Sequence, residues 1–420
     1  MKLNEDLILT DAQFEAELNR CEYCEEQPCR TGCLEGEPCA IGCPSNVSPP
    51  DFIMAARGGR PSDIRRAAAI IMTANPLGGV CGMACPDRHC MGTCVHEELD
   101  CPINIPAVQA TIIHKARQLG VMPEFAPAPS LEKKVAVIGS GPAGLAAAAL
   151  LGRKGYRVDI FEERSVAGGT ARCIPSYRLR PDMLDQDIEF CLTLGRIELK
   201  LNSPVGDPSS LLGNGYDAVL VCPGLWESIL PGIPNEDVAI KGLEYLADPS
   251  AYDLKGRVAV IGGGAAATDC AVTAKKSGAD YVEMFALEAV GEMPLTADEM
   301  NELLENGIDI NGRVRVNAIR AEDGKVTGLD LVKVAIPPDS EFSLDAVEEM
   351  PACLQTRTGI DHVIIAIGTR SSYPRVDNPA VFYAGDFITG PSTVVEAVAS
   401  GKNTAEKIEA FLEEKEEPVF

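Results

Sequence analysis

Two stretches of the chain share one hydrophobic pattern, in which a short apolar run ends in a cluster of glycines and an alanine-rich segment follows. They read VAVIGSGPAGLAAAALL at residues 135–151 and VAVIGGGAAATDCAVTA at residues 258–274. An apolar run without alternation is typical of a parallel strand buried on both faces, and the glycines mark a tight turn into a helix. The pattern therefore predicts a strand–turn–helix unit at each place.

The rest of the chain adds strands between and after these units, and helices before them. Further apolar runs of strand length lie at residues 157–161, 216–224, 281–286 and 361–368. Ahead of the first unit, a capping box that begins at Thr10 predicts a short helix, and residues 61–73 predict another. The proline-rich residues 121–130 cannot hold regular structure and predict a linker. The expected fold class is α/β, with a helical N-terminal domain followed by two Rossmann-like dinucleotide-binding domains.

Composition and charge narrow the possible partners. With 420 residues the chain is too long for one core, so two or three domains are expected. The net charge of −25 repels phosphate backbones and anionic lipid, which argues against nucleic acid and a bare membrane as partners. No apolar run has the length of a membrane span, and the first ten residues carry acids where a signal peptide is apolar. We expect a cytoplasmic protein, in which sixteen cysteines indicate metal, cluster or redox chemistry.

The glycines after the first strand form a G-x-G-x-x-G motif in the setting that binds a dinucleotide. Gly139 allows the tight turn, Gly141 lets the backbone approach a pyrophosphate, and Gly144 lets helix and strand pack closely. The next strand delivers Glu162, whose carboxylate can accept hydrogen bonds from ribose hydroxyls. The predicted contacts are Gly139, Gly141, Pro142, Ala143, Gly144, Glu162 and Glu163.

The second strand–turn–helix unit carries a second dinucleotide fingerprint. It has alanine in place of the third glycine, a substitution that the motif permits. Two fingerprints in one chain predict two dinucleotides, FAD and a nicotinamide. The predicted contacts of the second are Gly262, Gly264, Ala265 and Ala266.

Eleven of the sixteen cysteines lie between residues 21 and 101, in two groups. The first group is Cys21-x2-Cys24-x4-Cys29-x3-Cys33 followed by Cys39-x3-Cys43, and the second is Cys81-x3-Cys85-x4-Cys90-x3-Cys94 followed by Cys101. Short spacings with a Cys-Pro at the end of a run bring thiolates round cubane iron–sulfur clusters. Zinc is the alternative, but zinc sites usually show two C-x2-C pairs and the sequence has one.

The chain resembles the glutamate synthase small-subunit family. That family includes the front half of dihydropyrimidine dehydrogenase and the flavin subunit of its bacterial two-subunit, NAD-dependent counterpart. The resemblance covers nearly the whole chain. It rests on the cysteine run at residues 21–33, NPLGGVCGMACPDRHCMGTC at residues 75–94, PINIPAVQ at residues 102–109 and IPSYRL at residues 174–179.

The resemblance implies two [4Fe–4S] clusters whose ligands are crossed between the two cysteine groups, with one ligand that is not a cysteine. Carried over by position, the ligands of one cluster are Cys21, Cys24, Cys29 and Cys94. Those of the other are Cys85, Cys90 and Gln109, together with Cys33 or Cys43.

An insertion at residues 34–43 sets this chain apart from the family, and it repeats the P-C-x3-C unit of residues 28–33. Counting back from Asp51 favours Cys43 as the ligand, whereas counting forward from Cys21 favours Cys33. The sequence leaves both open. The spare cysteines are either buried small hydrophobic residues or ligands of a third cluster.

The resemblance also implies where the flavin lies. An A-G-D motif places the carboxylate of Asp386 on the ribityl chain, and a helix that begins near Ser392 points its N-terminal amides at the flavin ring. The implied flavin contacts of this kind are Gly169, Thr170, Arg178, Gly385, Asp386, Thr393, Val394 and Ala397. The implied domains are residues 1–125 for the clusters, 126–252 with 366–420 for FAD, and 253–365 for the nicotinamide.

The choice of nicotinamide depends on the residues after the second strand of the second unit. NADPH-using relatives carry a pair of arginines where Leu287 and Glu288 stand here. Arginine neutralises the 2′-phosphate, whereas an acid hydrogen-bonds a free 2′-hydroxyl and repels a phosphate. We predict NADH, with Glu288 at the ribose. The alternative is that Glu288 is a solvated surface acid.

These parts predict an iron–sulfur flavoprotein subunit that passes electrons between NADH and a partner through FAD and [4Fe–4S] clusters, in a direction that the sequence leaves open. Such chemistry belongs to the cofactors and requires no catalytic acid, base or nucleophile. No substrate-reducing domain remains, so a separate catalytic or electron-carrier subunit is expected. The alternatives are the flavin subunit of an NAD-dependent dihydropyrimidine dehydrogenase or of a glutamate synthase-type enzyme, and a redox-sensing flavoprotein. A dithiol reductase would need a C-x2-C beside the flavin, whereas Cys173 and Cys270 are single.

Overall fold

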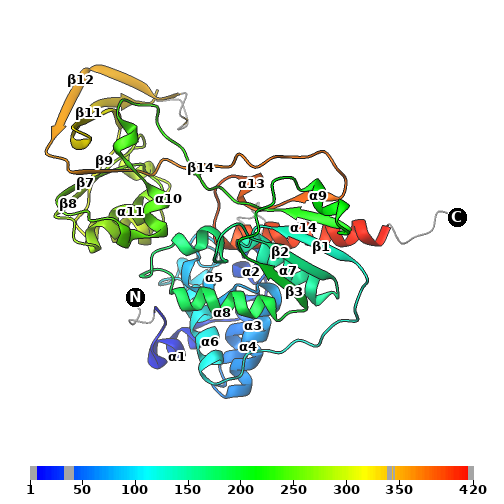
Figure 1. Cartoon of the computed structure of the whole chain (residues 1–420). Coiled ribbons are helices and arrows are strands. Elements are labelled where there is room, and N and C mark those ends of the chain that lie inside the picture. Colours follow the sequence, from blue (N-terminus) through cyan, green and yellow to red (C-terminus); the bar gives the residue numbers. More distant parts are fainter. Residues whose placement is uncertain (1–6, 33–41, 338–342, 344–345, 415–420) are drawn as a thin grey trace. The chain divides into compact units, whose positions relative to one another are not determined.

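The chain divides into two compact units (Figure 1). The computed structural model describes residues 7–32, 42–337, 343 and 346–414. The first unit comprises Met1–Arg172, Ser176–Leu225 and Ser371–Phe420, and the second comprises Cys173–Pro175 and Trp226–Arg370.

Helices make up the N-terminal part of the first unit. They are α1 (Asp11–Arg20), α2 (Pro28–Thr31), α3 (Pro49–Ala56), α4 (Pro61–Ala74), α5 (Gly78–Ala84) and α6 (Ile105–Gln118), with a 3-10 turn η1 (Val95–Glu97). The capping box at the start of α1 is confirmed, because Gln13 N donates to Thr10 Oγ1 (3.3 Å) and Thr10 N donates to Gln13 Oε1 (3.0 Å). The helix predicted at residues 61–73 is confirmed as α4.

Helix α6 lies at the centre of this helical part. Its Ala110, Ile112 and Ile113 are fully buried, and α3, α4 and α5 all pack against it. A Cβ atom at Gly82 would lie 2.5 Å from the backbone nitrogen of Ala110, so α5 and α6 approach to backbone contact. This close approach brings the cysteines on and after α5 beside Gln109 of α6.

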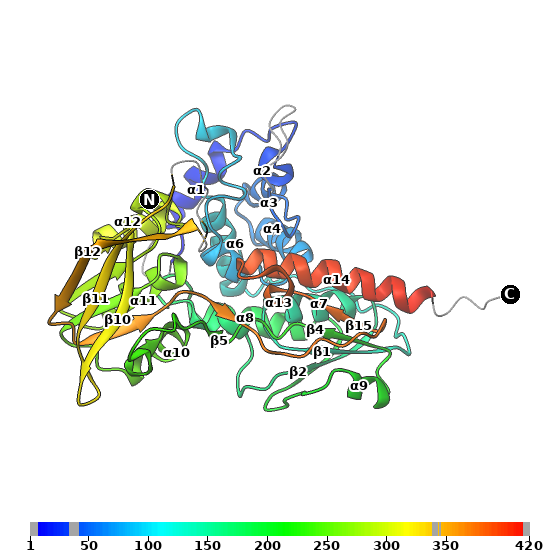
Figure 2. The ribbon, with the colours of Figure 1, turned by 90° about the horizontal axis from the view of Figure 1, so that it is seen from above.

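A five-stranded parallel sheet forms the other part of the first unit. Its order is β15 (Val381–Tyr383), β4 (Ala218–Val221), β1 (Lys134–Ile138), β2 (Arg157–Phe161) and β3 (Arg196–Lys200). The accompanying helices are α7 (Pro142–Arg153), α8 (Pro181–Leu192), α9 (Ser209–Gly213), α13 (Asp386–Thr389) and α14 (Val394–Glu414). Strand β4 is apolar and buried throughout, and β1 is so from Val135 onward, as their hydrophobic runs predict. Helix α14, drawn in red, packs along α7 (Figure 2).

The second unit contains another five-stranded parallel sheet and an antiparallel one. The parallel order is β6 (Ile240–Lys241), β13 (His362–Ile365), β7 (Arg257–Ile261), β8 (Tyr281–Phe285) and β9 (Asp309–Asn311). The antiparallel order is β10 (Val314–Glu322), β11 (Lys325–Ala335) and β12 (Glu348–Thr358), and a pair is formed by β5 (Glu227–Ser228) and β14 (Thr369–Arg370). The helices are α10 (Gly242–Ala247), α11 (Ala265–Lys276) and α12 (Ala297–Glu305). One apolar core, which includes Phe285 and Leu329, joins the two larger sheets.

The α/β class and both strand–turn–helix units are confirmed. The long segment of the second unit begins at Trp226, so residues 226–252 pack with this unit, although the sequence assigns them to the flavin domain. The domain bounds stay a prediction. Within the part of the chain that the structure describes, no single helix has the length and apolar character to cross a membrane. Helices α4 and α5, which meet at 88°, pass that test only as a pair.

Candidate cofactor and cluster sites

The glycine turn after β1 has a geometry that only glycine permits. Gly139 has φ +100°, and a Cβ atom there would overlap the carbonyl oxygen of Cys222. A Cβ atom at Gly144 would overlap the carbonyl oxygen of Gly139. The start of α7 is thereby pressed against the sheet, and the backbone of Gly141 is left bare for a pyrophosphate at the helix N-terminus.

Glu162 lies directly beneath this turn, at the end of β2. Its Oε2 accepts hydrogen bonds from Ser140 N (3.0 Å) and Ser140 Oγ (2.5 Å), and its Oε1 accepts from Arg164 N (2.9 Å). Ser140 is fully buried, and the sequence offered no signal for this role because serine is only a variable position of the motif. Glu163, the other predicted acid, is exposed. The turn and the acid are therefore brought together as predicted, with Ser140 holding the carboxylate in place.

The A-G-D loop and the start of α14 lie beside the same turn. A Cβ atom at Gly385 would come within 3.0 Å of Ala143 Cβ, and Gly385 N donates to Ser400 Oγ (2.9 Å). Asp386 Oδ1 accepts from Ser392 Oγ (2.5 Å), and burial raises the pKa of Asp386.

A further predicted residue, Gly169, lies at this place. Gly169 has φ +59°, and a Cβ atom there would lie 2.8 Å from the Cα of Gly141. The glycine loops thus leave bare backbone beside two helix N-termini, a donor set that fits FAD. Thr170 and Arg178 are half-buried on the segments that follow.

Helix α14 begins with a capping box that the sequence analysis did not identify. Thr393 N and Thr393 Oγ1 donate to Glu396 Oε2 (2.8 and 2.6 Å), and Glu396 N donates to Thr393 Oγ1 (3.3 Å). The box fixes the first turn of the helix, which carries the predicted flavin contacts Val394 and Ala397. The motif T-x-x-E was visible in the sequence and could have revealed it.

The contact between α14 and α7 provides a test of the flavin site. A Cβ atom at Gly401 would overlap the carbonyl oxygen of Ala143, next to the glycine turn. Gly401→Ala should therefore force the helices apart, lower the free energy of unfolding by about 1–3 kcal/mol, and reduce bound FAD. Thermal unfolding and the flavin content per chain measure both effects. Gly213→Ala is the matched control, because nothing lies within 4 Å of its added Cβ atom, and a loss of FAD in both variants would contradict this assignment.

The second fingerprint also leaves an open face. Gly262 has φ +142°, a Cβ atom at Gly264 would meet nothing within 4 Å, and Ala265 and Ala266 are exposed at the start of α11. Glu288 points to this turn, because its Oε2 lies 2.7 Å from the position of a Cβ atom on Gly263. The carboxylate thus lies over the fingerprint loop and fits a ribose.

An arginine distant in the sequence also lies at this place. Arg313 N donates to the carbonyl oxygen of Glu288 (2.9 Å), and its guanidinium donates to the carbonyl oxygen of Leu287 (3.4 Å) and pairs with Glu292 (2.6 Å). The residues between β8 and β9 include no arginine. The sequence carries no signal for Arg313, because it lies beyond β9 and only the fold brings it to Glu288. The Glu292 carboxylate that pairs with Arg313 is half exposed.

The four predicted ligands of the first cluster come from three elements. Cys21 ends α1, Cys29 lies in α2, and Cys94 precedes η1, while Cys24 lies between α1 and α2. Burial, together with the neighbouring thiols of Cys94, Cys21 and Cys24, raises the pKa of Cys29 to about 12. These four thiols are therefore near enough to one another to interact electrostatically. Cluster binding at this site must displace thiol protons.

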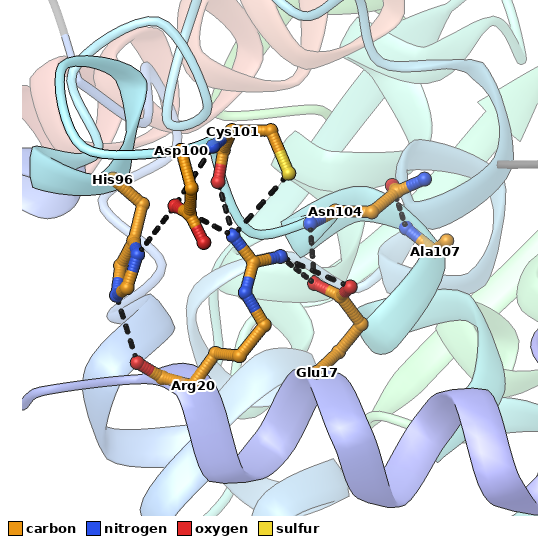
Figure 3. Close-up of polar contacts among 7 residues, drawn as sticks. All are labelled: Glu17, Arg20, His96, Asp100, Cys101, Asn104 and Ala107. Atoms are coloured by element: carbon orange, nitrogen blue, oxygen red, sulfur yellow. Dashed lines mark hydrogen bonds and ion pairs between the residues drawn. The ribbon is translucent and has the colours of Figure 1, made fainter.

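A polar network fixes two of the segments that carry these thiols (Figure 3). Arg20, the neighbour of Cys21, pairs with Glu17 (3.2 Å) and Asp100 (3.1 Å). His96, two residues after Cys94, makes hydrogen bonds to Asp100 through Nδ1 (2.9 Å) and to the carbonyl oxygen of Arg20 through Nε2 (2.9 Å). The network ties the end of α1 to η1.

Of the residues predicted for the second cluster, those that the structure describes line one pocket. Its wall includes Cys43, Cys81, Cys85, Cys90, Gln109, Asn75, His89 and Val395. Gln109 is buried, and its Nε2 donates to the carbonyl oxygen of Gly78 (2.7 Å), so its side-chain oxygen is the atom that could bind iron. Burial raises the pKa values of Cys43 and Cys90. Cys81, Asn75 and His89 were not predicted for this pocket.

The candidate ligand Cys33 and most of the insertion, with Cys39, lie outside the described residues. Among the residues that are described, no three His, Cys, Asp or Glu side chains converge where one metal ion could bind. A cubane needs no such convergence, because its ligands bind four different iron atoms. The thiols and the amide oxygen in the pocket therefore fit an iron–sulfur cluster.

Sequence comparisons place the chain among iron–sulfur flavoproteins. Residues 133–401 match the pyridine nucleotide-disulphide oxidoreductase family, and residues 3–121 match dihydropyrimidine dehydrogenase domain II, 4Fe-4S cluster. The glutamate synthase [NADPH] small chain of Escherichia coli K12 is 30% identical, with 96% of this chain and 92% of that one covered. The NAD-dependent dihydropyrimidine dehydrogenase subunit PreT of Salmonella typhimurium is 32% identical (95% and 94%). The NADP(+)-dependent formate dehydrogenase subunit beta of Moorella thermoacetica is 33% identical (89%), and the chain spans 60% of its length.

Solved structures support the fold. The thioredoxin reductase of T. acidophilum is 20% identical and superposes with a TM-score of 0.51, covering 67% of this chain and 99% of that one. A 2-naphthoyl-CoA reductase is 18% identical, with a TM-score of 0.55 and coverage of 86% and 52%. At these identities the likeness concerns the fold alone.

Proposed function

Because the chain belongs to the pyridine nucleotide-disulphide oxidoreductase family and carries the 4Fe–4S domain of dihydropyrimidine dehydrogenase, we propose that it passes electrons between NADH and a partner subunit. It is an oxidoreductase subunit of the iron–sulfur flavoprotein type, with FAD, a nicotinamide dinucleotide and 4Fe–4S as cofactors. The observation that carries the proposal is the pocket in which Val395, from the first turn of α14, meets Cys85 and Cys90.

The cofactors supply the chemistry: FAD exchanges a hydride with the nicotinamide, and the clusters exchange single electrons. The chain binds, orients and shields them. The start of α14 directs backbone amides at the flavin, while its Val395 and Glu396 reach the second cysteine group, where Glu396 pairs with Arg88 (3.6 Å). The second group is therefore the one beside the flavin.

The first cysteine group completes the path. Cys29 raises the pKa of Cys90 electrostatically, and Thr93 Oγ1 donates to the carbonyl oxygen of Pro28 (3.0 Å), so the two groups adjoin. Tyr23, between two thiols of the first group, is 46% exposed. We place the order of transfer as flavin, second cluster, first cluster, with exchange to the partner near Tyr23.

The partner is proposed to be a separate catalytic or electron-carrier subunit. Three relatives are subunits or chains by name, which supports a hetero-oligomer. The preference for NADH is supported by Glu288 over the second fingerprint loop. Location in the cytoplasm stays a prediction from the sequence.

Anaerobic reduction tests this function. NADH should bleach the flavin absorbance and then give electron paramagnetic resonance signals from two reduced clusters, with about eight iron atoms per chain. A preparation with stoichiometric zinc and no acid-labile sulfide would contradict it. Steady-state oxidation of NADH with an artificial acceptor separates an enzyme from a redox sensor, because a sensor would show a single turnover.

The ligand role of Gln109 has its own test. A neutral amide leaves its cluster less negatively charged than a fourth thiolate would, so Gln109→Cys should lower one reduction potential and leave the other nearly fixed. Potentiometric titration followed by electron paramagnetic resonance measures both. Gln118→Cys at the far end of α6 is the control. Unchanged potentials and spectra in Gln109→Cys would show that Gln109 is not a ligand.

A further inference from the structure

Two buried polar side chains in the pocket of the second cysteine group each carry a nitrogen that has no hydrogen-bond partner among the described residues. They are Asn75, through Nδ2, and His89, through Nε2. Asn75 is 0% exposed and His89 is 7% exposed. Both line the pocket together with Cys43, Cys85 and Cys90. Because a buried N–H without an acceptor is destabilising, these groups indicate that an acceptor belongs in the pocket.

The orientation of the Asn75 amide follows from its neighbour. Leu77 N donates to Asn75 Oδ1 (2.9 Å), so the oxygen of the amide faces the backbone. The NH2 group then has no acceptor among the described residues. The backbone of Asn75 is also held, because its N–H donates to the carbonyl oxygen of Ile71 (2.8 Å) at the end of α4. Turning the amide over would place two donors against each other at Leu77.

Helix α14 fixes the segment before Asn75 to the segment after Cys43. Lys402 Nζ donates to the carbonyl oxygens of Ser45 (2.8 Å) and Ala74. Ser45 Oγ donates to the carbonyl oxygen of Ala74 as well (2.8 Å). Asn75 and Cys43 are therefore held in one rigid arrangement by a helix of the flavin-binding part. These bonds hold the backbone next to Asn75, while the bond from Leu77 N holds its side-chain amide.

We propose that Asn75 Nδ2 donates a hydrogen bond to a sulfur atom of the second cluster and thereby raises its reduction potential. Reduction adds negative charge to the sulfur atoms, so a fixed donor stabilises the reduced cluster more than the oxidised one. The cluster beside the flavin then accepts an electron more readily. His89 supplies a second donor of this kind when its proton is on Nε2. The inference rests on the proposed function, because it requires a cluster in this pocket.

Asn75→Leu tests the hydrogen bond, because leucine has a similar size and neither a donor nor a charge. The equilibrium constant for reduction of the second cluster should fall at least tenfold, which is about 59 mV for one electron, and the first cluster should not change. After exchange into D2O, the reduced second cluster of the unmodified protein should show an exchangeable proton coupling in electron–nuclear double resonance. That coupling should disappear or weaken in Asn75→Leu.

Asn104→Leu is the matched control. Asn104 also accepts a backbone hydrogen bond, from Ala107 N (3.1 Å), but it does not line the pocket. Both potentials and the coupling should stay as they are in this variant. If leucine prevents folding at position 75, Asn75→Ala removes the same donor without adding volume and should give the same result.

The outcomes separate this inference from the proposed function. Two clusters with an unchanged potential and an unchanged proton coupling in the Asn75 variants would overturn the hydrogen bond and leave the electron path intact. An unmodified protein that holds no second cluster would instead overturn the proposed function.

Discussion

NADH should be oxidised with a kcat/KM about two to four decades higher than that of NADPH. The carboxylate of Glu288 lies over the fingerprint loop, where it can accept a hydrogen bond from a free 2′-hydroxyl but repels a 2′-phosphate. Losing a charge-assisted contact and gaining a repulsion each cost about 1.5–3 kcal/mol. Arg313, the arginine beside Glu288, already forms an ion pair with Glu292.

Leu287→Arg combined with Glu288→Gln should shrink this gap, mainly through a faster reaction with NADPH. Ala286 is left unchanged in this design because it is 2% exposed, so an arginine there would be buried. Steady-state kinetics with both dinucleotides measure the ratio. Glu305→Gln removes one charge from an exposed position of the same unit and should leave the ratio as it is. Equal use of NADPH by the unmodified protein would show that Glu288 does not face the ribose.

Cys43→Ala should remove the second cluster and lower the iron content from about eight to about four atoms per chain. Cys43 lines the pocket with Cys85, Cys90 and Gln109. A cubane cluster that has lost one of its four protein ligands is held weakly. Iron and sulfide analysis with electron paramagnetic resonance of the reduced protein measures the loss. Because burial raises the pKa of Cys43, loading of the unmodified protein should improve as pH rises.

Two variants complete this test. Cys191→Ala changes a buried cysteine that belongs to neither group, so both clusters should remain. Cys33→Ala should also keep both clusters if Cys43 is the ligand. Loss of the second cluster in Cys33→Ala, but not in Cys43→Ala, would reverse the assignment. About twelve iron atoms in the unmodified protein would indicate a third cluster.

Local patterns in the sequence predicted most of the helices and strands. The strands β1, β2, β7 and β8 match their apolar runs to within a residue, because unbroken hydrophobicity followed by Gly139 or Gly262 has few other solutions. Helices α1 and α4 begin at sequence signals, a capping box and a proline at the first position. Strand β13 was recognised as a strand, but its place beside β7 depends on long-range pairing.

The sequence by itself determined the cofactors, because glycine turns and closely spaced cysteines are local requirements of dinucleotides and clusters. Only the tertiary structure brought Asn75 and His89 to Cys43, turned Glu288 over the second fingerprint and supplied Arg313 from beyond β9. These relations join residues far apart in the chain, and no spacing rule records them. Asn75 shows the reason most clearly: its role depends on which of its two amide atoms is already bonded, and Leu77 N decides that only in the folded chain.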